Sequence, residues 1–142
     1  MGSIINNEII ITPLKQVNVE GGNVLHALKN TDNGYHGFGE AYFSWIEHGS
    51  IKAWKRHLRM TMNLIVPVGN VQFVFITDEG NLLVREIIGE NNYVRITVPP
   101  GIWFGFKGEF APKSLVLNLA SITHDPDEVE RLPKEVFNDK FL

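Results

Sequence analysis

The 142-residue chain contains no cysteine, so disulfide bonds, cysteine-ligated zinc, iron–sulfur clusters and thiol catalysis are excluded. It also lacks the apolar run of roughly 18 residues that a membrane-spanning helix needs. Neither sign of charge dominates, because 13 Lys and Arg stand against 16 Asp and Glu and leave a net charge of −3. No overall field therefore attracts nucleic acid. We expect a cytoplasmic protein that binds neither nucleic acid nor membranes.

Short segments rich in Val, Ile, Phe and Tyr recur between turn residues, and no segment keeps a 3.6-residue apolar period for three turns. This pattern predicts an all-β fold. The expected strands are residues 8–14, 23–28, 40–46, 50–55, 60–68, 71–77, 81–88, 93–98, 102–107 and 114–121.

A set of short strands in a chain of this size must protect its edges, and a closed or two-sheet barrel is the usual solution. We predict one domain over residues 1–142 with a jelly-roll β-barrel fold. Residues 125–131 begin with an aspartate that can cap a helix, so a single helical turn at the periphery is expected there.

The first sequence motif of the cupin superfamily, a group of jelly-roll barrels, can be tested by counting. It reads Gly, five residues, His, one residue, His, three or four residues, Glu, six residues, Gly. The frame fits here at full length from Gly49 to Gly69, but His57 is the single metal ligand of the expected type. Lys55 and Met62 stand at the other ligand positions.

The second cupin motif places a histidine shortly after a Pro-x-Gly turn, and here Phe104 follows the turn at 99–101. One imidazole cannot hold a transition-metal ion, and Lys, Met and Phe are no replacement at neutral pH. His36 and His48 lack the spacing of metal ligands. We therefore predict no metal and no other cofactor.

Four segments of the chain resemble the dTDP-4-dehydrorhamnose 3,5-epimerase family of cupins: residues 38–43, 51–57, 98–108 and 118–128. The chain is also similar to the 3,4-ketoisomerases that act on dTDP-4-keto-6-deoxyglucose. The resemblance implies a cupin jelly-roll fold, a homodimer, a nucleotide-diphosphate sugar as ligand, and metal-free proton transfer next to a keto group. We therefore expect an epimerase or isomerase of a nucleotide-diphosphate 4-keto-6-deoxysugar, acting in deoxysugar or surface-polysaccharide biosynthesis.

The resemblance also gives each candidate position an implied role. The base histidine of the epimerases corresponds to Lys55, and a second histidine of the ketoisomerases is retained as His57. The proton-donating tyrosine of the family falls near Asn118, and a further histidine is replaced by Phe104. Because these positions depart from the family pattern, a catalytically inactive cupin that binds a sugar nucleotide or carbohydrate is the alternative hypothesis.

Three residues are the candidate catalytic groups, since the reaction needs a base and a proton donor. His57 is the best base, and Lys55, two residues away on the same strand face, is a base, an electrophile or an enolate stabiliser. Tyr42 is the alternative proton donor. In a purely structural reading, Lys55 is a solvated charge at the barrel mouth and His57 is a hydrogen-bonded core residue.

The remaining candidates are expected to bind the substrate. Lys52 and Arg59 belong to a cluster of cations that suits a diphosphate. Glu40 resembles a substrate-binding carboxylate of the family, and Trp103 is a stacking platform for a sugar or base. Asn118 and Phe104 complete the expected pocket, whereas Arg56 faces the other way and is a candidate contact to a dimer partner.

Overall fold

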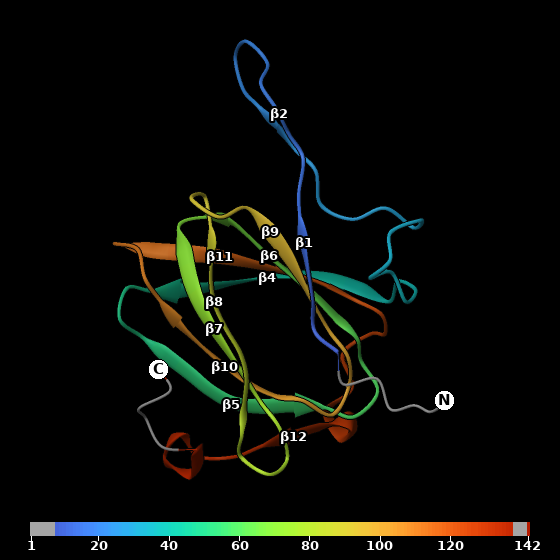
Figure 1. The fold of residues 1–142 in the computed structure, drawn as a ribbon, viewed down its shortest axis with the longest axis vertical. Helices are drawn as coiled ribbons and strands as arrows, with labels where there is room; N and C mark the ends of the chain where they lie inside the picture. Colours follow the sequence, from blue (N-terminus) through green and yellow to red (C-terminus); the bar gives the residue numbers. More distant parts are fainter. Residues whose placement is uncertain (1–7, 138–141) are drawn as a thin grey trace.

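The computed structural model describes residues 8–137 and 142, and within these residues two five-stranded antiparallel sheets lie face to face (Figure 1). The strand order of the first sheet is β1-β9-β6-β11-β4, and that of the second is β12-β5-β10-β7-β8. The first sheet comprises β1 (Ile10–Pro13), β9 (Val94–Val98), β6 (Met62–Val68), β11 (Lys113–Ala120) and β4 (Glu40–Glu47). The second comprises β12 (Val129–Arg131), β5 (Ile51–His57), β10 (Trp103–Gly108), β7 (Asn70–Ile76) and β8 (Leu82–Gly89).

The main core fills the space between the two sheets. Alternation along each strand sends every second side chain inward, so that Phe73 and Phe75 of β7 meet Phe104 and Phe106 of β10. Leu64 and its same-face neighbours on β6 close the core from the first sheet. The all-β, cupin-like fold expected from the sequence is confirmed.

Nine of the ten expected segments become strands of the two main sheets, and 23–28 does not. Only Val24–Leu25 of that segment is a strand, β3, and it pairs with β2 (Gln16–Val17) in a separate two-stranded sheet. This hairpin projects away from the two main sheets (Figure 1). Gly21 and Gly22, both with positive φ, lie between these two strands, and within the described residues β2 and β3 pair only with each other.

The helical turn expected over 125–131 is correct only in its first half. Asp125 caps a short 3-10 helix, η1 (Pro126–Glu128), through its side chain, which accepts a hydrogen bond from the backbone N–H of Asp127. From Val129 onward the chain is instead strand β12, which pairs with β5 and places Arg131 opposite Lys55. The segment is therefore part of the second sheet, because the exposed edge of β5 supplies hydrogen bonds that a local helix would forgo.

Within the ranges 8–137 and 142, no helix is long and apolar enough to cross a membrane. The helical elements found there are the short 3-10 helices η1 and η2 (Lys134–Phe137).

One testable prediction concerns Gly69, the single residue through which the chain passes from β6 in one sheet to β7 in the other. Its φ is +84°, and a Cβ there would lie 2.8 Å from the Cβ of Ser114. Gly49 has a similar φ of +82° but open space around it. In urea unfolding, Gly49→Ala should lose about 1–2 kcal/mol for the left-handed backbone, and Gly69→Ala about 1–3 kcal/mol more for overpacking. Equal losses in the two variants would show that the corner tolerates the extra methyl group.

Candidate active site

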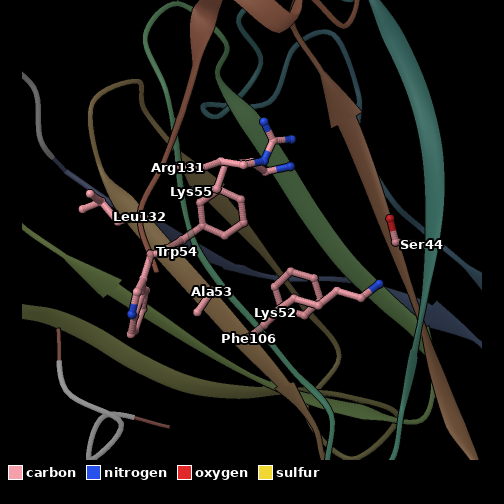
Figure 2. A pocket seen from close by; sticks show the side chains of 9 residues that line it. Ser44, Lys52, Ala53, Trp54, Lys55, Phe106, Arg131 and Leu132 are labelled. Atoms are coloured by element: carbon pink, nitrogen blue, oxygen red, sulfur yellow. The ribbon is translucent and has the colours of Figure 1, made fainter. Parts of the chain in front are cut away.

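The candidate active site is a hollow between the sheets with an inner part and a mouth. The inner part is a cavity of about 60 Å³ lined by Tyr42, Ser44, Lys55, His57, Met62, Leu64, Phe73, Phe104, Phe106, Val116 and Asn118. The mouth, of about 300 Å³, is lined by Ser44, Lys52, Ala53, Trp54, Lys55, Phe104, Phe106, Arg131 and Leu132 (Figure 2). Because Ser44, Lys55, Phe104 and Phe106 line both, the two parts adjoin.

At the inner end, His57 and Glu128 form a buried pair. The His57 Nδ1 atom is hydrogen-bonded to the Glu128 carboxylate, and the residues are 3% and 2% exposed. The other carboxylate oxygen accepts the backbone N–H groups of Arg59 at 2.9 Å and Met60 at 3.1 Å. Glu128 is therefore held in place by three hydrogen bonds, and it in turn fixes the orientation of the imidazole.

The environment keeps the His57 ring neutral and its second nitrogen free. Burial lowers the pKa of His57 below 6.5 against the opposing hydrogen bond and charge of Glu128, and Lys55 lowers it further in its protonated form. A neutral ring that donates its Nδ1 proton to Glu128 carries a lone pair on Nε2. This Nε2 atom is buried and has no hydrogen-bond partner among the described residues. Since His57 lines the cavity, Nε2 is an available proton acceptor there.

A hydroxyl group faces the same cavity from the opposite sheet. Tyr42 on β4 and Asn118 on β11 are directly opposite each other in the strand register. The Asn118 side-chain amide donates a hydrogen bond of 3.0 Å to the Tyr42 hydroxyl oxygen. Burial raises the pKa of Tyr42 above 10 and outweighs the opposing hydrogen bond from Asn118, and the negative charges of Glu40 and Glu128 add to the rise. The phenol thus keeps its proton, and its oxygen already accepts a bond, so the proton is free for a ligand.

The mouth of the hollow is cationic. Lys52 and Lys55 on β5 lie with Arg131 on β12 around it, and Figure 2 shows Lys55 beside Arg131. Simple alternation would send Lys52 and Lys55 to opposite faces, but the ladder between β10 and β5 shifts register by one residue. Lys52 therefore pairs opposite Phe106 and Lys55 opposite Phe104, both inward-facing phenylalanines.

Phe104 is an apolar platform between the two parts of the hollow. The ring of His57 stacks on it at 6.2 Å between centroids, and the Lys55 Nζ atom lies 5.9 Å from its centre. This residue stands where the second cupin motif has a histidine. Its ring removes water from the neighbourhood of Lys55 and His57 instead of offering a polar ligand.

The structure does not bring three of the expected substrate-binding residues to this hollow. The Arg59 side chain is largely exposed and pairs with Asp125 at 2.9 Å. The Glu40 carboxylate caps the backbone N–H of His124 at 2.8 Å. Trp103 points to the other face of its sheet, because its neighbour Phe104 points inward, and there it packs in a second apolar cluster with Trp54.

Arg56 has partners within its own chain. It pairs with Glu130 on β12 and with Asp78, and its guanidinium lies 4.7 Å from the centre of the Trp103 ring. These contacts lie on the outer face of β5, the face on which strand alternation predicted Arg56.

The sequence did not indicate Glu128 and Arg131, the two residues that the segment 126–131 places at the site. The pattern of Glu128 three residues after Asp125 was visible, but it reads equally well as part of a capped turn. Only the pairing of β12 with β5, over more than 70 residues of sequence, shows that Glu128 meets His57.

Metal ligands do not gather anywhere in the described part of the chain: no three His, Asp or Glu side chains lie in an arrangement that could hold a metal ion.

Comparisons with known proteins agree with this fold. No protein-family model matches the chain. The chain is 31% identical over 102 residues to the probable low-salt glycan biosynthesis epimerase Agl13 of Haloferax volcanii. That match covers 66% of this chain and 65% of the relative, slightly less than two thirds of its length.

Solved structures extend the likeness over nearly the whole chain. The crystal structure of a dTDP sugar isomerase from Desulfovibrio desulfuricans G20 is 34% identical with a TM-score of 0.86, covering 92% of this chain and 88% of that one. The dTDP-4-dehydrorhamnose 3,5-epimerase from Sulfolobus tokodaii shares the fold at 17% identity and a TM-score of 0.78, covering 92% and 80%. The class is thus that of cupin-like sugar-nucleotide epimerases and isomerases. Within that class, the chain belongs to the dTDP-sugar isomerase family, and the resemblance stated above is confirmed.

The buried pair generates a prediction for Glu128→Gln. Burial raises the pKa of Glu128, but the hydrogen bonds from His57, Arg59 and Met60 outweigh it and lower the pKa below 4.5. The carboxylate of Glu128 is therefore protonated at a higher pH in the unfolded chain than in the folded protein. The stability that Glu128 contributes is present above about pH 4.5, and it is lost as the pH falls through the lower pKa of the folded protein. The variant should lose about 1–3 kcal/mol at pH 7 and much less at acidic pH, as measured by urea unfolding.

Glu130→Gln is the matched control, because Glu130 is exposed and its pair with Arg56 is worth about 1 kcal/mol or less. If Glu128→Gln were as mild as Glu130→Gln at pH 7, the buried pair would contribute no net stability.

Proposed function

We propose that this protein is an epimerase or isomerase that moves protons next to the keto group of a nucleotide-diphosphate 4-keto-6-deoxysugar. The observation that carries the proposal is the free Nε2 atom of the buried His57–Glu128 pair, which faces the same cavity as the Tyr42 hydroxyl. Such a reaction needs one group to remove a proton beside a carbonyl and another to return it.

His57 is the proposed base. Its lowered pKa keeps the imidazole neutral at physiological pH, and the carboxylate of Glu128 stabilises the imidazolium that forms when the proton is taken. Glu128 acts through His57, so it is a positioning residue rather than a catalytic one.

Tyr42 is the proposed acid, and Asn118 is its positioning residue. The hydrogen bond from Asn118 orients the phenol, and the raised pKa of Tyr42 keeps it protonated until a developing negative charge accepts the proton. Because Tyr42 is on the first sheet and His57 on the second, the two groups can reach opposite faces of a sugar ring between them. Inversion of a carbon centre requires that arrangement.

The cationic mouth is the proposed site for the diphosphate. Lys52 and Arg131 supply charge there, and arginine pairs with phosphate oxygens through two parallel hydrogen bonds. With the diphosphate at the mouth, the sugar lies inward beside Lys55 and His57. The apolar lining of the inner cavity, including Leu64, Phe73 and Val116, suits a deoxygenated methyl group better than a hydroxymethyl group.

Membership of the dTDP-sugar isomerase family supports this assignment, as does the similarity to Agl13, a probable low-salt glycan biosynthesis epimerase. We therefore place the reaction in the formation of deoxysugars for glycans or polysaccharides.

A homodimer is part of the proposal. The outer face of edge strand β4 carries Phe43 and Trp45, which are 61% and 49% exposed. Leu117 and Leu115 lie directly opposite them on β11, so the four side chains form one apolar face. A monomer rarely leaves a continuous apolar patch in water, and a two-fold axis would bury this face against its own copy.

The catalytic proposal predicts solvent exchange. In heavy water, the wild-type protein should exchange the proton at carbon 3 or carbon 5 of dTDP-4-keto-6-deoxyglucose for deuterium. Proton NMR would show this exchange as loss of the corresponding signal. His57→Asn should slow this exchange by roughly 10²- to 10⁴-fold, since it deletes the base, while its affinity for dTDP in calorimetry stays within a few fold.

His36→Asn serves as the control, because His36 is exposed and does not line the hollow. Retention of both proton signals with the wild-type protein would contradict the proposed activity on this sugar. Equal exchange by His57→Asn and wild type would remove His57 from the role of base.

The dimer proposal predicts that the wild-type protein sediments as a dimer and that the double variant Phe43→Ser, Trp45→Ser sediments as a monomer. The control is Leu58→Ser, which changes a large exposed apolar residue outside this face, 45% exposed in the wild type. A wild-type monomer, or a double variant that remains dimeric, would refute the interface.

A further inference from the structure

Lys55 is distinguished from the other basic residues of β5 by having no polar partner. Lys52 Nζ donates a hydrogen bond to the backbone oxygen of Trp45 at 2.8 Å, and Arg56 pairs with two carboxylates. Across the described residues, no hydrogen bond or ion pair reaches the Nζ atom of Lys55, whose contact is with the ring of Phe104. The Lys55 side chain is half-buried, so an ammonium group in this position would be partly removed from water and would have no paired carboxylate among these residues.

The charges around Lys55 also favour its neutral amine. Arg131 stands directly opposite it in the register of β12, and Lys52 lies on the same face of β5. The nearest carboxylate, that of Glu128, is engaged by His57 and two backbone N–H groups. Burial lowers the pKa of Lys55, and the charges of Arg131 and Lys52 lower it further, against the opposing charge of Glu128. A lysine that is desolvated beside other cations is an activated nucleophile.

The position of Lys55 fits an attack on the keto carbon. Lys55 lines both the mouth and the inner cavity, so it stands between the proposed diphosphate site and the proposed base. His57 is two residues further along the same strand and on the same face, about 7 Å away at the backbone. A sugar whose carbonyl carbon reaches Lys55 therefore presents the adjacent C–H group toward His57.

We propose that Lys55 forms an imine with the keto group of the substrate, and that the proton is transferred at the carbon next to this imine. This inference rests on the proposed function and names a covalent step within it. The amine nitrogen bonds to the keto carbon, and the carbonyl oxygen leaves as water with one amine proton and one proton from solvent. The product of this step is an iminium ion.

The rest of the cycle needs no further reagent. His57 removes a proton from the neighbouring carbon, and the electron pair of the broken C–H bond neutralises the iminium to give an enamine. A proton returns to the same carbon from Tyr42 on the other face and restores the iminium, now inverted. Water then adds to the iminium carbon and releases the ketone, the free amine of Lys55 and one proton to solvent. Exchange with solvent removes the proton from His57 and restores that of Tyr42. The net change is an isomerisation, with no oxidant or reductant.

The iminium gives this site a way to stabilise the carbanion without an oxyanion hole. A ketone that loses an adjacent proton places negative charge on its oxygen, which then needs hydrogen-bond donors. An iminium accepts the same electron pair on a positively charged nitrogen. The amine of Lys55 is reachable from the cavity and carries no competing bond, as this chemistry requires.

The test is reductive trapping. The protein is incubated with dTDP-4-keto-6-deoxyglucose and sodium cyanoborohydride, and intact mass and peptide mapping locate any reduced sugar nucleotide. We expect one adduct per chain at Lys55 in the wild type and in His57→Asn, and none in Lys55→Arg. Lys107→Arg, a lysine variant on the paired strand β10 outside both parts of the hollow, should keep the adduct.

Solvent deuterium incorporation, measured in parallel on the wild type, separates the two proposals. An adduct at Lys55 with incorporation that falls at least a hundredfold in Lys55→Arg supports both. Incorporation without an adduct, or retained by Lys55→Arg, overturns the imine and leaves the proposed function standing. An adduct at Lys55 without incorporation supports the imine and overturns the proton transfer. Absence of both overturns both. The adduct map of the wild type decides the outcome even if Lys55→Arg fails to fold.

Discussion

The buried hydrogen bond between His57 and Glu128 is the interaction on which the arrangement of the site depends. It joins the end of β5 to the turn that precedes β12, and so ties the edge strand of the second sheet to the residues that line the hollow. The two backbone N–H groups of Arg59 and Met60 complete the carboxylate's coordination, so the chain that leaves β5 is fixed by the same side chain. One acidic residue thereby sets the orientation of the imidazole, the path of the backbone and the position of Arg131.

Charge in the hollow is graded from mouth to interior. Lys52 and Arg131 lie toward solvent, Lys55 is half-buried at the junction, and His57 is buried and neutral at the inner end. Burial and neighbouring cations lower the pKa of both Lys55 and His57, against the opposing effect of Glu128. A ligand with a dianionic end and an uncharged ring matches this gradient, and the reverse orientation would bury its phosphates against Phe104 and Phe73.

Most of the fold could be read from the sequence, because strand alternation and turn residues are local signals. The spacing of the first cupin motif predicted that Lys55 and His57 share a strand face. Both line the inner cavity, as do the other candidates Tyr42, Asn118 and Phe104. The shared face of Lys52 and Lys55 could not be read, since it depends on a register shift against β10. Glu128 and Arg131 were missed for the same reason: their roles arise from pairing between distant strands. Trp103 was misplaced because an aromatic residue beside a turn gives no local sign of which face it occupies.

The pairing of Tyr42 with Asn118 has a consequence for how such sites change over time. Residues directly opposite each other in an antiparallel ladder project from neighbouring backbones to nearly the same point in space. A functional hydroxyl can therefore be supplied from either strand, and the amide that faces it keeps it oriented. Two substitutions, one on each strand, would move the group from one backbone to the other with little change in the cavity. A column-by-column alignment scores such an exchange as two losses, although the chemistry at that point is preserved.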